Sequence, residues 1–321
     1  MNRFSFDDHP NYRVKQPNLL YIDRYGNIYP DCKTYKTPIL CHITDKNAVD
    51  LVREKTFGPG ASGTYNMITV EVSSACQANC LYCFQRDAHR NDKYAYYDYL
   101  LPFLDALDAY WVFFSGGEIL IQKDAMEFMR SFRKANPAAW IHLKTNGNAD
   151  ESAVTFVSEV CNSVMVSFNG FSPTTYETIM GLKIDKTKMF CEAVKKQGRA
   201  NLGLKLLNSP ITISETPEFL EWAFSLKPKC IALQNAFNYE VEPSGKSSRL
   251  SSTLPPRGFS LYWDDVYEAI SARCDNVLNK HRAEINGGCN YLTADRDFLQ
   301  LLSLSSSNMS LFRTDGVYII E

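Results

Sequence analysis

The sequence predicts an α/β protein, a partial (β/α)6 barrel of parallel strands with N- and C-terminal extensions. Short runs of β-branched and aromatic residues alternate with longer amphipathic stretches, as they do in successive strand–helix units. The run Trp111–Phe114 is continuously apolar, which is typical of a parallel strand buried on both faces. A closed eight-fold barrel needs about 250 residues, so an open, incomplete barrel fits the repeating part of the chain better.

Each strand is predicted from a short apolar run and each helix from apolar residues at helical spacing. In chain order the expected strands are Ile68–Val72, Trp111–Phe114, Trp140–Lys144, Ser163–Phe168, Leu202–Leu207 and Cys230–Gln234. The expected helices are Tyr96–Asp108, Lys123–Lys134, Ser152–Val160, Lys186–Gln197 and Pro217–Ser225. Thr216 is the expected N-cap of the last helix, with Pro217 at its first helical position.

The chain divides into an N-terminal extension over residues 1–65, the partial barrel over residues 66–235 and a C-terminal extension over residues 236–321. The first part carries a hairpin signal at Tyr25-Gly26-Asn27. The last part is expected to cover the barrel mouth. Its expected elements are a surface loop at Glu240–Pro256, a helix at Ser260–Lys280 and a weak hairpin at Asp315-Gly316.

Charge and hydropathy exclude several classes of protein. The 34 Lys and Arg residues nearly balance the 36 Asp and Glu residues, so the net charge is −2 and no nucleic-acid or membrane partner is expected. No apolar run approaches the roughly 18–20 residues of a membrane span. The first residues lack the basic and apolar regions of a signal peptide. A cytoplasmic protein is therefore expected.

Cysteine usage gives the strongest signal. The chain has ten cysteines, and in a reducing compartment a cluster of them points to metal binding or chemistry. Cys161, Cys191 and Cys230 are single residues in apolar surroundings and are expected to be inert, buried thiols.

Three other cysteines form the pattern Cys76-Gln-Ala-Asn-Cys80-Leu-Tyr-Cys83, directly after the first expected barrel strand. That position is the carboxyl end of the strands, where α/β folds bind their ligands. Three thiolates in one short loop can bind a [4Fe–4S] cluster and leave one iron open for chemistry. Two alternatives stay open: a zinc site completed by Cys41 or His42, and buried thiols without a ligand role.

The C-x3-C-x2-C spacing, with Tyr82 before the last cysteine, resembles the signature of the radical S-adenosylmethionine (SAM) superfamily. Further motifs occur in the order that this family has them, each after a strand, over residues 66–235. They are Ser115-Gly116-Gly117-Glu118, Thr145-Asn146-Gly147 and Val166-Ser167-Phe168-Asn169-Gly170. The resemblance implies a [4Fe–4S] cluster on Cys76, Cys80 and Cys83, with SAM bound beside it.

The resemblance also implies roles for the other motif residues. Ser115, Gly116, Gly117 and Glu118 would hold the amino group of SAM, and adjacent glycines let the backbone come close to a ligand. Asn146 and Ser167 would hold a ribose or a carboxylate; helix capping and turn formation remain the alternative. Lys205 would meet the cofactor carboxylate or reach solvent. The ring of Tyr82 would pack beside the cluster while its backbone faces adenine.

By resemblance, the chemistry belongs to the cofactors. One electron, from a donor such as flavodoxin or ferredoxin, cleaves SAM to methionine and a 5′-deoxyadenosyl radical, which removes a hydrogen atom from the substrate. The stretch from Val166 to Gly181 is similar to that of peptide- and protein-modifying members. A peptide or protein substrate is therefore expected. The alternatives are a small-molecule radical enzyme acting on a sugar, nucleoside or amino acid, and a non-catalytic iron–sulfur or zinc-binding protein. No catalytic side chain is assigned.

Many peptide-modifying relatives carry a C-terminal domain with further clusters, and this chain departs from that pattern after Cys289. A single cluster is expected. A second cluster built from four scattered cysteines stays open as an alternative: Cys32, Cys41, Cys274 and Cys289.

Overall fold

The structure is a computed structural model of the chain. It describes residues 19–30, 39–60, 67–81, 83, 94–107, 109, 111–208, 212–235, 272–274, 276–277, 279–281 and 291–294.

One ten-stranded sheet organises the described residues, in the order β10-β9-β8-β7-β6-β5-β4-β1-β2-β3. The strands are β1 (Leu19–Ile22), β2 (Asn27–Pro30), β3 (Cys41–His42), β4 (Met67–Glu71), β5 (Trp111–Ser115), β6 (Trp140–Thr145), β7 (Ser163–Phe168), β8 (Asn201–Asn208), β9 (Cys230–Asn235) and β10 (Tyr291–Ala294). All six predicted barrel strands are present, from β4 to β9. They are parallel neighbours in chain order, so the predicted α/β fold with its parallel sheet is confirmed.

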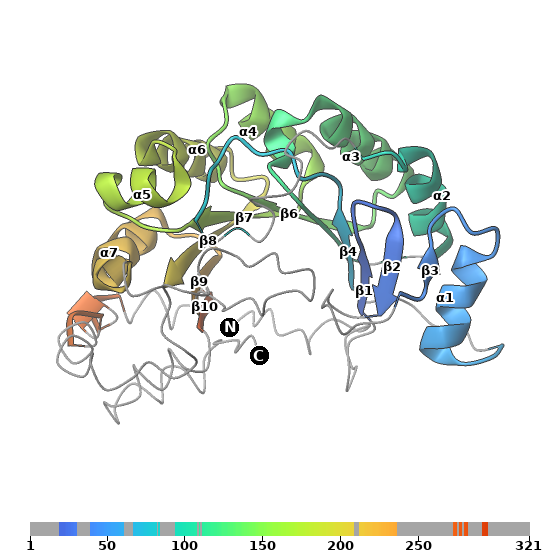
Figure 1. The fold of residues 1–321 in the computed structure, drawn as a ribbon. Helices are drawn as coiled ribbons and strands as arrows, with labels where there is room; N and C mark the ends of the chain where they lie inside the picture. The colour runs from blue at the N-terminus through green and yellow to red at the C-terminus, as the bar shows by residue number, and fades with distance from the viewer. Residues whose placement is uncertain are drawn as a thin grey trace.

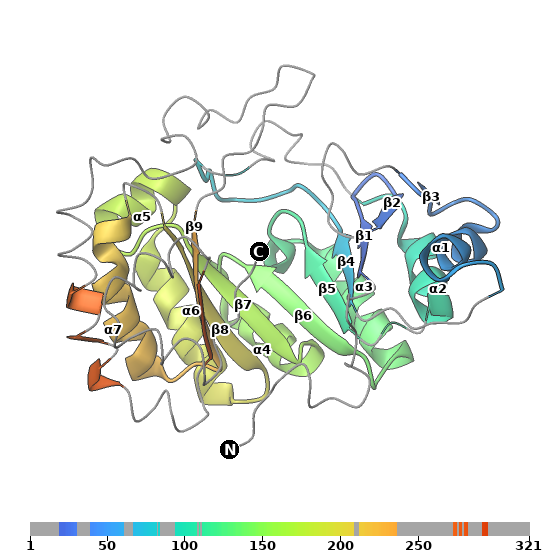
Figure 2. The ribbon, with the colours of Figure 1, turned by 90° about the horizontal axis from the view of Figure 1, so that it is seen from below.

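Helices line the convex side of this curved sheet (Figure 1). The α-helices are α1 (Ala48–Phe57), α2 (Tyr97–Leu107), α3 (Lys123–Ala135), α4 (Glu151–Val160), α5 (Pro173–Met180), α6 (Ile184–Gln197) and α7 (Thr216–Leu226), with short 3-10 turns η2 (Ile119–Ile121) and η3 (Ile213–Glu215). No described helix lies over the concave side, onto which Figure 2 looks. None of the described helices is long and apolar enough to cross a membrane.

The five predicted helices correspond to α2, α3, α4, α6 and α7, whereas α1 and α5 were not predicted. Ser172 caps α5 by accepting from the Thr175 N–H, a signal that was readable in Ser172-Pro173. The prediction that Thr216 is an N-cap is wrong. Thr216 is the first helical residue and is buried, and Glu215 occupies the cap position.

Burial alternates along β5, which corrects another prediction. Val112 and Phe114 are buried under the helices, whereas Trp111 and Phe113 are only half-buried on the concave side. The strand is therefore not buried on both faces. The same alternation on β7 places Ser163 and Ser167 on the concave side.

The N-terminal hairpin is present, with β1 and β2 antiparallel and register pairs from Leu20↔Pro30 to Ile22↔Ile28. β1 also pairs in parallel with β4, so the hairpin continues the barrel sheet. Gly26 in the turn has φ +80°, and a Cβ there would lie 2.7 Å from His42 Nε2, so the turn requires glycine. His42, the possible zinc ligand, lies in β3.

Little of the C-terminal extension is described. Short helical pieces between residues 272 and 281 pack on α7, where Arg273 pairs with Glu218 and Lys280 with Glu221. The predicted loop at 240–256 and the hairpin at 315–316 lie outside the described residues, as does most of the predicted helix at 260–280.

Candidate functional site

The cysteine loop leaves the carboxyl end of β4 and runs against the end of β5. The Gly117 N–H donates to Ser73 O at 2.6 Å, and the Glu118 N–H donates to Ala75 O at 2.7 Å. A Cβ on Gly116 would lie 2.3 Å from Ser73 O, and one on Gly117 would lie 2.1 Å from Ala75 O. Both glycines are therefore required by the close approach of the loop backbone. The N–H groups of Gly117 and Glu118 are used within the protein in this way, whereas the predicted contact of this turn with the amino group of SAM stays a prediction.

A second set of backbone hydrogen bonds holds the other side of the loop. The Asn79 N–H donates to Met180 O at 2.8 Å, and the Leu81 N–H donates to Ile179 O at 2.9 Å. Both acceptors lie at the carboxyl end of α5, the helix that sequence reasoning missed. The loop is thus fixed from β5 on one side and from α5 on the other.

The three thiols of the loop are half-buried, and Cys76 and Cys83 lie near enough to Cys80 to affect its ionisation. Burial, together with the nearby Cys83 and Cys76 thiols, raises the pKa of Cys80 to about 12. A hydrogen bond from the Asn169 side chain, just after β7, acts in the opposite direction. Mutual repulsion of this kind is relieved when a metal centre binds the deprotonated sulfurs.

The donor set fits a cluster better than a single ion. Among the described residues, no three His, Cys, Asp or Glu side chains are arranged to hold one metal ion. Zinc draws all its ligands to one centre at about 2.3 Å from sulfur, whereas a cuboidal cluster binds each cysteine to a different iron. His42, the alternative zinc ligand, hydrogen-bonds Thr44 Oγ1 and Tyr25 O through its two ring nitrogens, each at 2.8 Å.

Glu118 joins the ends of β5 and β6. Its carboxylate is buried and accepts from Thr145 Oγ1 and the Asn146 N–H at 2.7 Å each, and from the Leu120 N–H at 3.1 Å. Burial raises its pKa, and these three hydrogen bonds oppose that shift. A carboxylate has about four acceptor positions, so the protein itself uses most of those on Glu118.

Asn146 connects the next strand end to the cysteine loop. Its Oδ1 accepts from the Asn148 N–H at 2.8 Å, which is the predicted turn role. The same oxygen accepts from Gln77 Nε2 at 3.3 Å, and Asn146 Nδ2 lies 3.8 Å from Cys76 Sγ. Asn146 therefore both forms the turn and positions the first cysteine.

The remaining predicted residues lie farther along the sheet. Ser167 on β7 and Lys205 on β8 are register partners, so both face the concave side at the same level. Tyr82 lies outside the described residues. Sequence reasoning assigned no role to Gln77, Thr145 or Asn169, although each lies within or directly beside a motif that it had identified.

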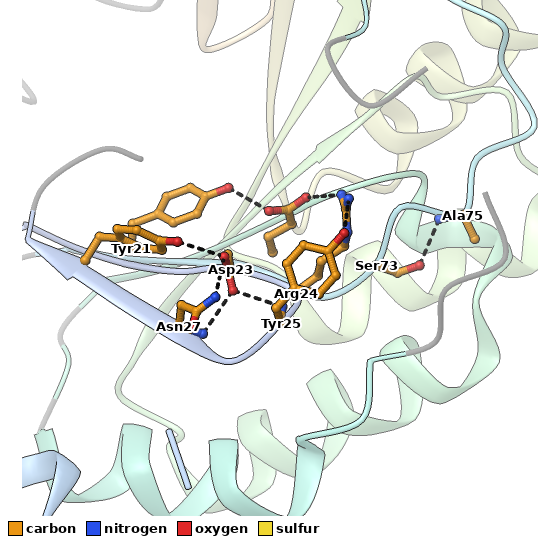
Figure 3. A network of polar contacts seen from close by, with 9 residues as sticks. Tyr21, Asp23, Arg24, Tyr25, Asn27, Ser73 and Ala75 are labelled. Atoms are coloured by element: carbon orange, nitrogen blue, oxygen red, sulfur yellow. Dashed lines mark hydrogen bonds and ion pairs between the residues drawn. The ribbon is translucent and has the colours of Figure 1, made fainter. Parts of the chain in front are cut away.

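A further polar network lies where β4 enters the cysteine loop (Figure 3). Glu71, nearly inaccessible to solvent, accepts from Tyr21 Oη at 2.9 Å and pairs with Arg24 Nη1 at 3.1 Å. Asp23 accepts from the backbone N–H groups of Tyr25 and Asn27 at 2.9 Å each. The hairpin thereby holds the strand end from which the loop starts.

The other cysteines do not form a second site among the described residues. Cys161 and Cys191 are buried as predicted, and burial raises the pKa of Cys161 to about 12. Cys41 lies in β3 at one end of the sheet, while Cys274 lies beside α7 at the other end. One cluster cannot use both, so the four-cysteine alternative is wrong. Cys32, Cys289 and the side chain of Cys230 lie outside the described residues.

Comparison with known proteins defines the class. The sequence model of the radical SAM superfamily matches residues 70–223, which begin in β4 and end in α7. The chain belongs to this superfamily and is a radical SAM enzyme, so the non-catalytic alternative is set aside. Membership implies a [4Fe–4S] cluster and SAM. A search of curated proteins found no match.

Solved structures share the fold at low identity. Streptococcus suis SuiB bound to precursor peptide SuiA is 12% identical, with a TM-score of 0.55 over 72% of this chain and 50% of that one. The anSMEcpe structure with bound AdoMet, which is SAM, is 20% identical, with a TM-score of 0.51 over 72% of this chain and 61% of that one. The chain thus spans between half and two thirds of the length of these proteins.

Proposed function

We propose that this enzyme modifies a peptide or protein, with a [4Fe–4S] cluster on Cys76, Cys80 and Cys83. The observation that carries the proposal is the cysteine loop itself, fixed between β5 and α5 with the Cys76 and Cys83 thiols close enough to Cys80 to affect its pKa. When bound, the cluster and SAM supply a 5′-deoxyadenosyl radical that removes a hydrogen atom from the substrate.

Side chains of this protein would position the cysteines and the strand ends around the cofactors. Asn146 and Gln77 orient Cys76, Asn169 orients Cys80, and Glu118 holds the ends of β5 and β6 at a fixed spacing. Ser115, Gly116, Gly117, Glu118, Asn146 and Ser167 lie at strand ends around the loop and are the proposed SAM contacts, together with Tyr82. The remaining acceptor position of Glu118 suits an ammonium group.

Two observations support a peptide as substrate. The stretch from Val166 to Gly181 is similar to that of peptide-modifying enzymes. The fold is also that of SuiB bound to precursor peptide SuiA and of anSMEcpe with a bound Kp18Cys peptide, the latter at a TM-score of 0.52. A sugar, nucleoside or free amino acid is the competing substrate class.

The test starts with anaerobic reconstitution, followed by reduction with SAM. Wild-type enzyme is expected to hold about four irons and to release 5′-deoxyadenosine and methionine. Cys80→Ala is expected to reduce that release to the level of a sample without enzyme, because the cluster loses a ligand. Cys161→Ala is the matched control, a buried thiol outside the loop, and should retain iron. Zinc in place of iron, or full turnover in Cys80→Ala, would contradict the proposal.

Substrate class is tested separately with the same preparation. Mass spectrometry after turnover is expected to show a peptide with two hydrogens fewer or with a new covalent link. Turnover only with sugars, nucleosides or free amino acids would assign the enzyme to the competing class while leaving the cluster assignment intact.

A further inference from the structure

The concave side of the sheet carries a row of aromatic side chains on β5 and β6. Trp111 is in register with Trp140, and Phe113 with His142. The ring centroids of Trp111 and Trp140 lie 6.3 Å apart, and Phe113 stacks on His142 at 4.5 Å. His142 Nδ1 is 2.6 Å from Ser163 Oγ. None of these residues belongs to the motifs around the cysteine loop.

Lys144 lies beyond these aromatic residues on β6, toward the carboxyl end of the strand and the cysteine loop. Its Nζ lies 4.6 Å from the centroid of the Phe113 ring, an attractive cation–π arrangement. The side chain is accessible, yet the surrounding sheet displaces enough water to lower its pKa. Across the sheet, Lys144 on β6 is in register with Met165 on β7, which is in register with Gly203 on β8. Lys144 is therefore the charged residue among these three register partners.

No described carboxylate neutralises this lysine. Glu71, an acidic residue on the same side of the sheet, is engaged by Arg24 and Tyr21. His142 does not compete for an anion, because burial and the charge of Lys144 lower its pKa to about 3 and keep it neutral. A desolvated ammonium without an opposite charge attracts an anion strongly.

The distance between Lys144 and the cysteine loop indicates which kind of molecule would carry this anion. Asn146, two residues farther along the chain, reaches Cys76, and two residues of a strand span about 7 Å. A molecule anchored at Lys144 therefore extends over the aromatic row with another part near the loop. Near neutral pH the anions of an unmodified peptide are its carboxylates, from Asp, Glu or the C-terminus, because cysteine thiols and tyrosine hydroxyls are mostly neutral there.

We propose that Lys144 is a specificity-determining residue that binds a carboxylate of the peptide substrate, with the rings of Trp111, Phe113 and Trp140 beside the neighbouring side chains of that peptide. This role rests on the proposed function, since it names the substrate class for the same site. An acidic side chain within the peptide is the expected source of the carboxylate.

The experiment measures peptide retention by reconstituted enzyme with SAM present. The probes are two five-residue libraries, acetylated and amidated at their ends, with a central Glu or a central Gln and mixed residues elsewhere. Wild-type enzyme is expected to retain the Glu library about tenfold better, the usual contribution of a charged hydrogen bond. Lys144→Met should abolish the preference, and Lys144→Arg should restore part of it. Lys134→Met, on the exposed side of α3, is the matched control and should keep it.

Further measurements separate the competing explanations. A third library with central Gln and a free C-terminal carboxylate reports whether the terminus is the source instead. Equal retention of all libraries by wild-type enzyme would overturn the proposal, as would a Glu preference that persists in Lys144→Met. Loss of SAM affinity in Lys144→Met would also overturn it, by assigning the lysine to the cofactor. Absence of 5′-deoxyadenosine from wild-type enzyme would refute the proposed function instead. Peptide retention is measured without turnover, so the two failures can be told apart.

Discussion

Phe113 and Phe114 are adjacent phenylalanines on β5, but they differ in burial and in the residues that they contact. Phe114 is fully buried beneath α3, with Phe128 and Phe132 edge-on to its ring at 6.1 and 6.0 Å. Phe113 lies on the concave side, where it stacks on His142 and faces the ammonium of Lys144. Because side chains alternate along a strand, one strand contributes to both the core and the site.

The same division holds along the sheet. On β6, Ile141 and Leu143 are buried under the helices, while the alternate positions on the other side are His142 and Lys144. On β7, Val164 and Val166 are buried and Ser167 faces the concave side. The convex side therefore carries most of the buried core, and the concave side carries the groups that we propose to recognise ligands.

Truncating Phe114 is the strongest test of this division. Phe114→Ala removes a fully buried ring and leaves a cavity between β5 and α3, which is expected to lower the free energy of unfolding by about 3–5 kcal/mol. Urea unfolding followed by circular dichroism measures the change.

Phe113→Ala is the matched comparison one residue away. This variant is expected to lower the free energy of unfolding by about 1 kcal/mol, since the ring is half-buried and contributes mainly its stacking on His142. Equal losses in the two variants would mean that the concave side is packed like the convex side, and the division would not hold.

The convex side was the more predictable one. Six strands and five helices follow from apolar periodicity, because burial against helices imposes it directly on the sequence. The burial of Trp111–Phe114 was predicted wrongly because all four side chains are apolar, so the sequence does not show which of them face the helices and which face the concave side. The missed helix α5 is short, and its amphipathic pattern is weak beside the polar run Pro173–Thr175.

At the site, the sequence identified the motifs but not their contacts. The spacing of Cys76, Cys80 and Cys83 marks a ligand loop, whereas the need for Gly116 and Gly117 comes from the backbone oxygens of Ser73 and Ala75, which lie 43 and 42 residues earlier in the chain. Lys144 had no motif to mark it. Its significance depends on the ring of Phe113 and on the absence of a described carboxylate nearby, and both are properties of the folded sheet.

Polar contacts on the concave side should matter less for stability than Phe114, even when they are buried. Arg24→Met removes the partner of Glu71 but leaves Tyr21 donating to it, so a loss of about 2 kcal/mol is expected. The control is Lys183→Met, which breaks an exposed pair with Glu177 and should change stability by less than about 0.5 kcal/mol. The urea midpoints of the two variants measure the difference, and equal shifts would show that Glu71 does not need Arg24 for stability.

A further prediction concerns the proton of His142. Its pKa is about 3 in the fold and about 6.5 when unfolded, so between these values the unfolded chain binds more protons. Stability therefore falls as pH decreases through this window. From pH 6.5 to pH 5.5 the wild type should lose about 1 kcal/mol more than His142→Gln, which cannot titrate. Parallel pH profiles of the urea midpoint in the two proteins would mean that His142 takes up a proton in the fold. A charged imidazolium beside Lys144 would then make the concave side more cationic in acid, and the preference for the Glu library would rise as pH falls.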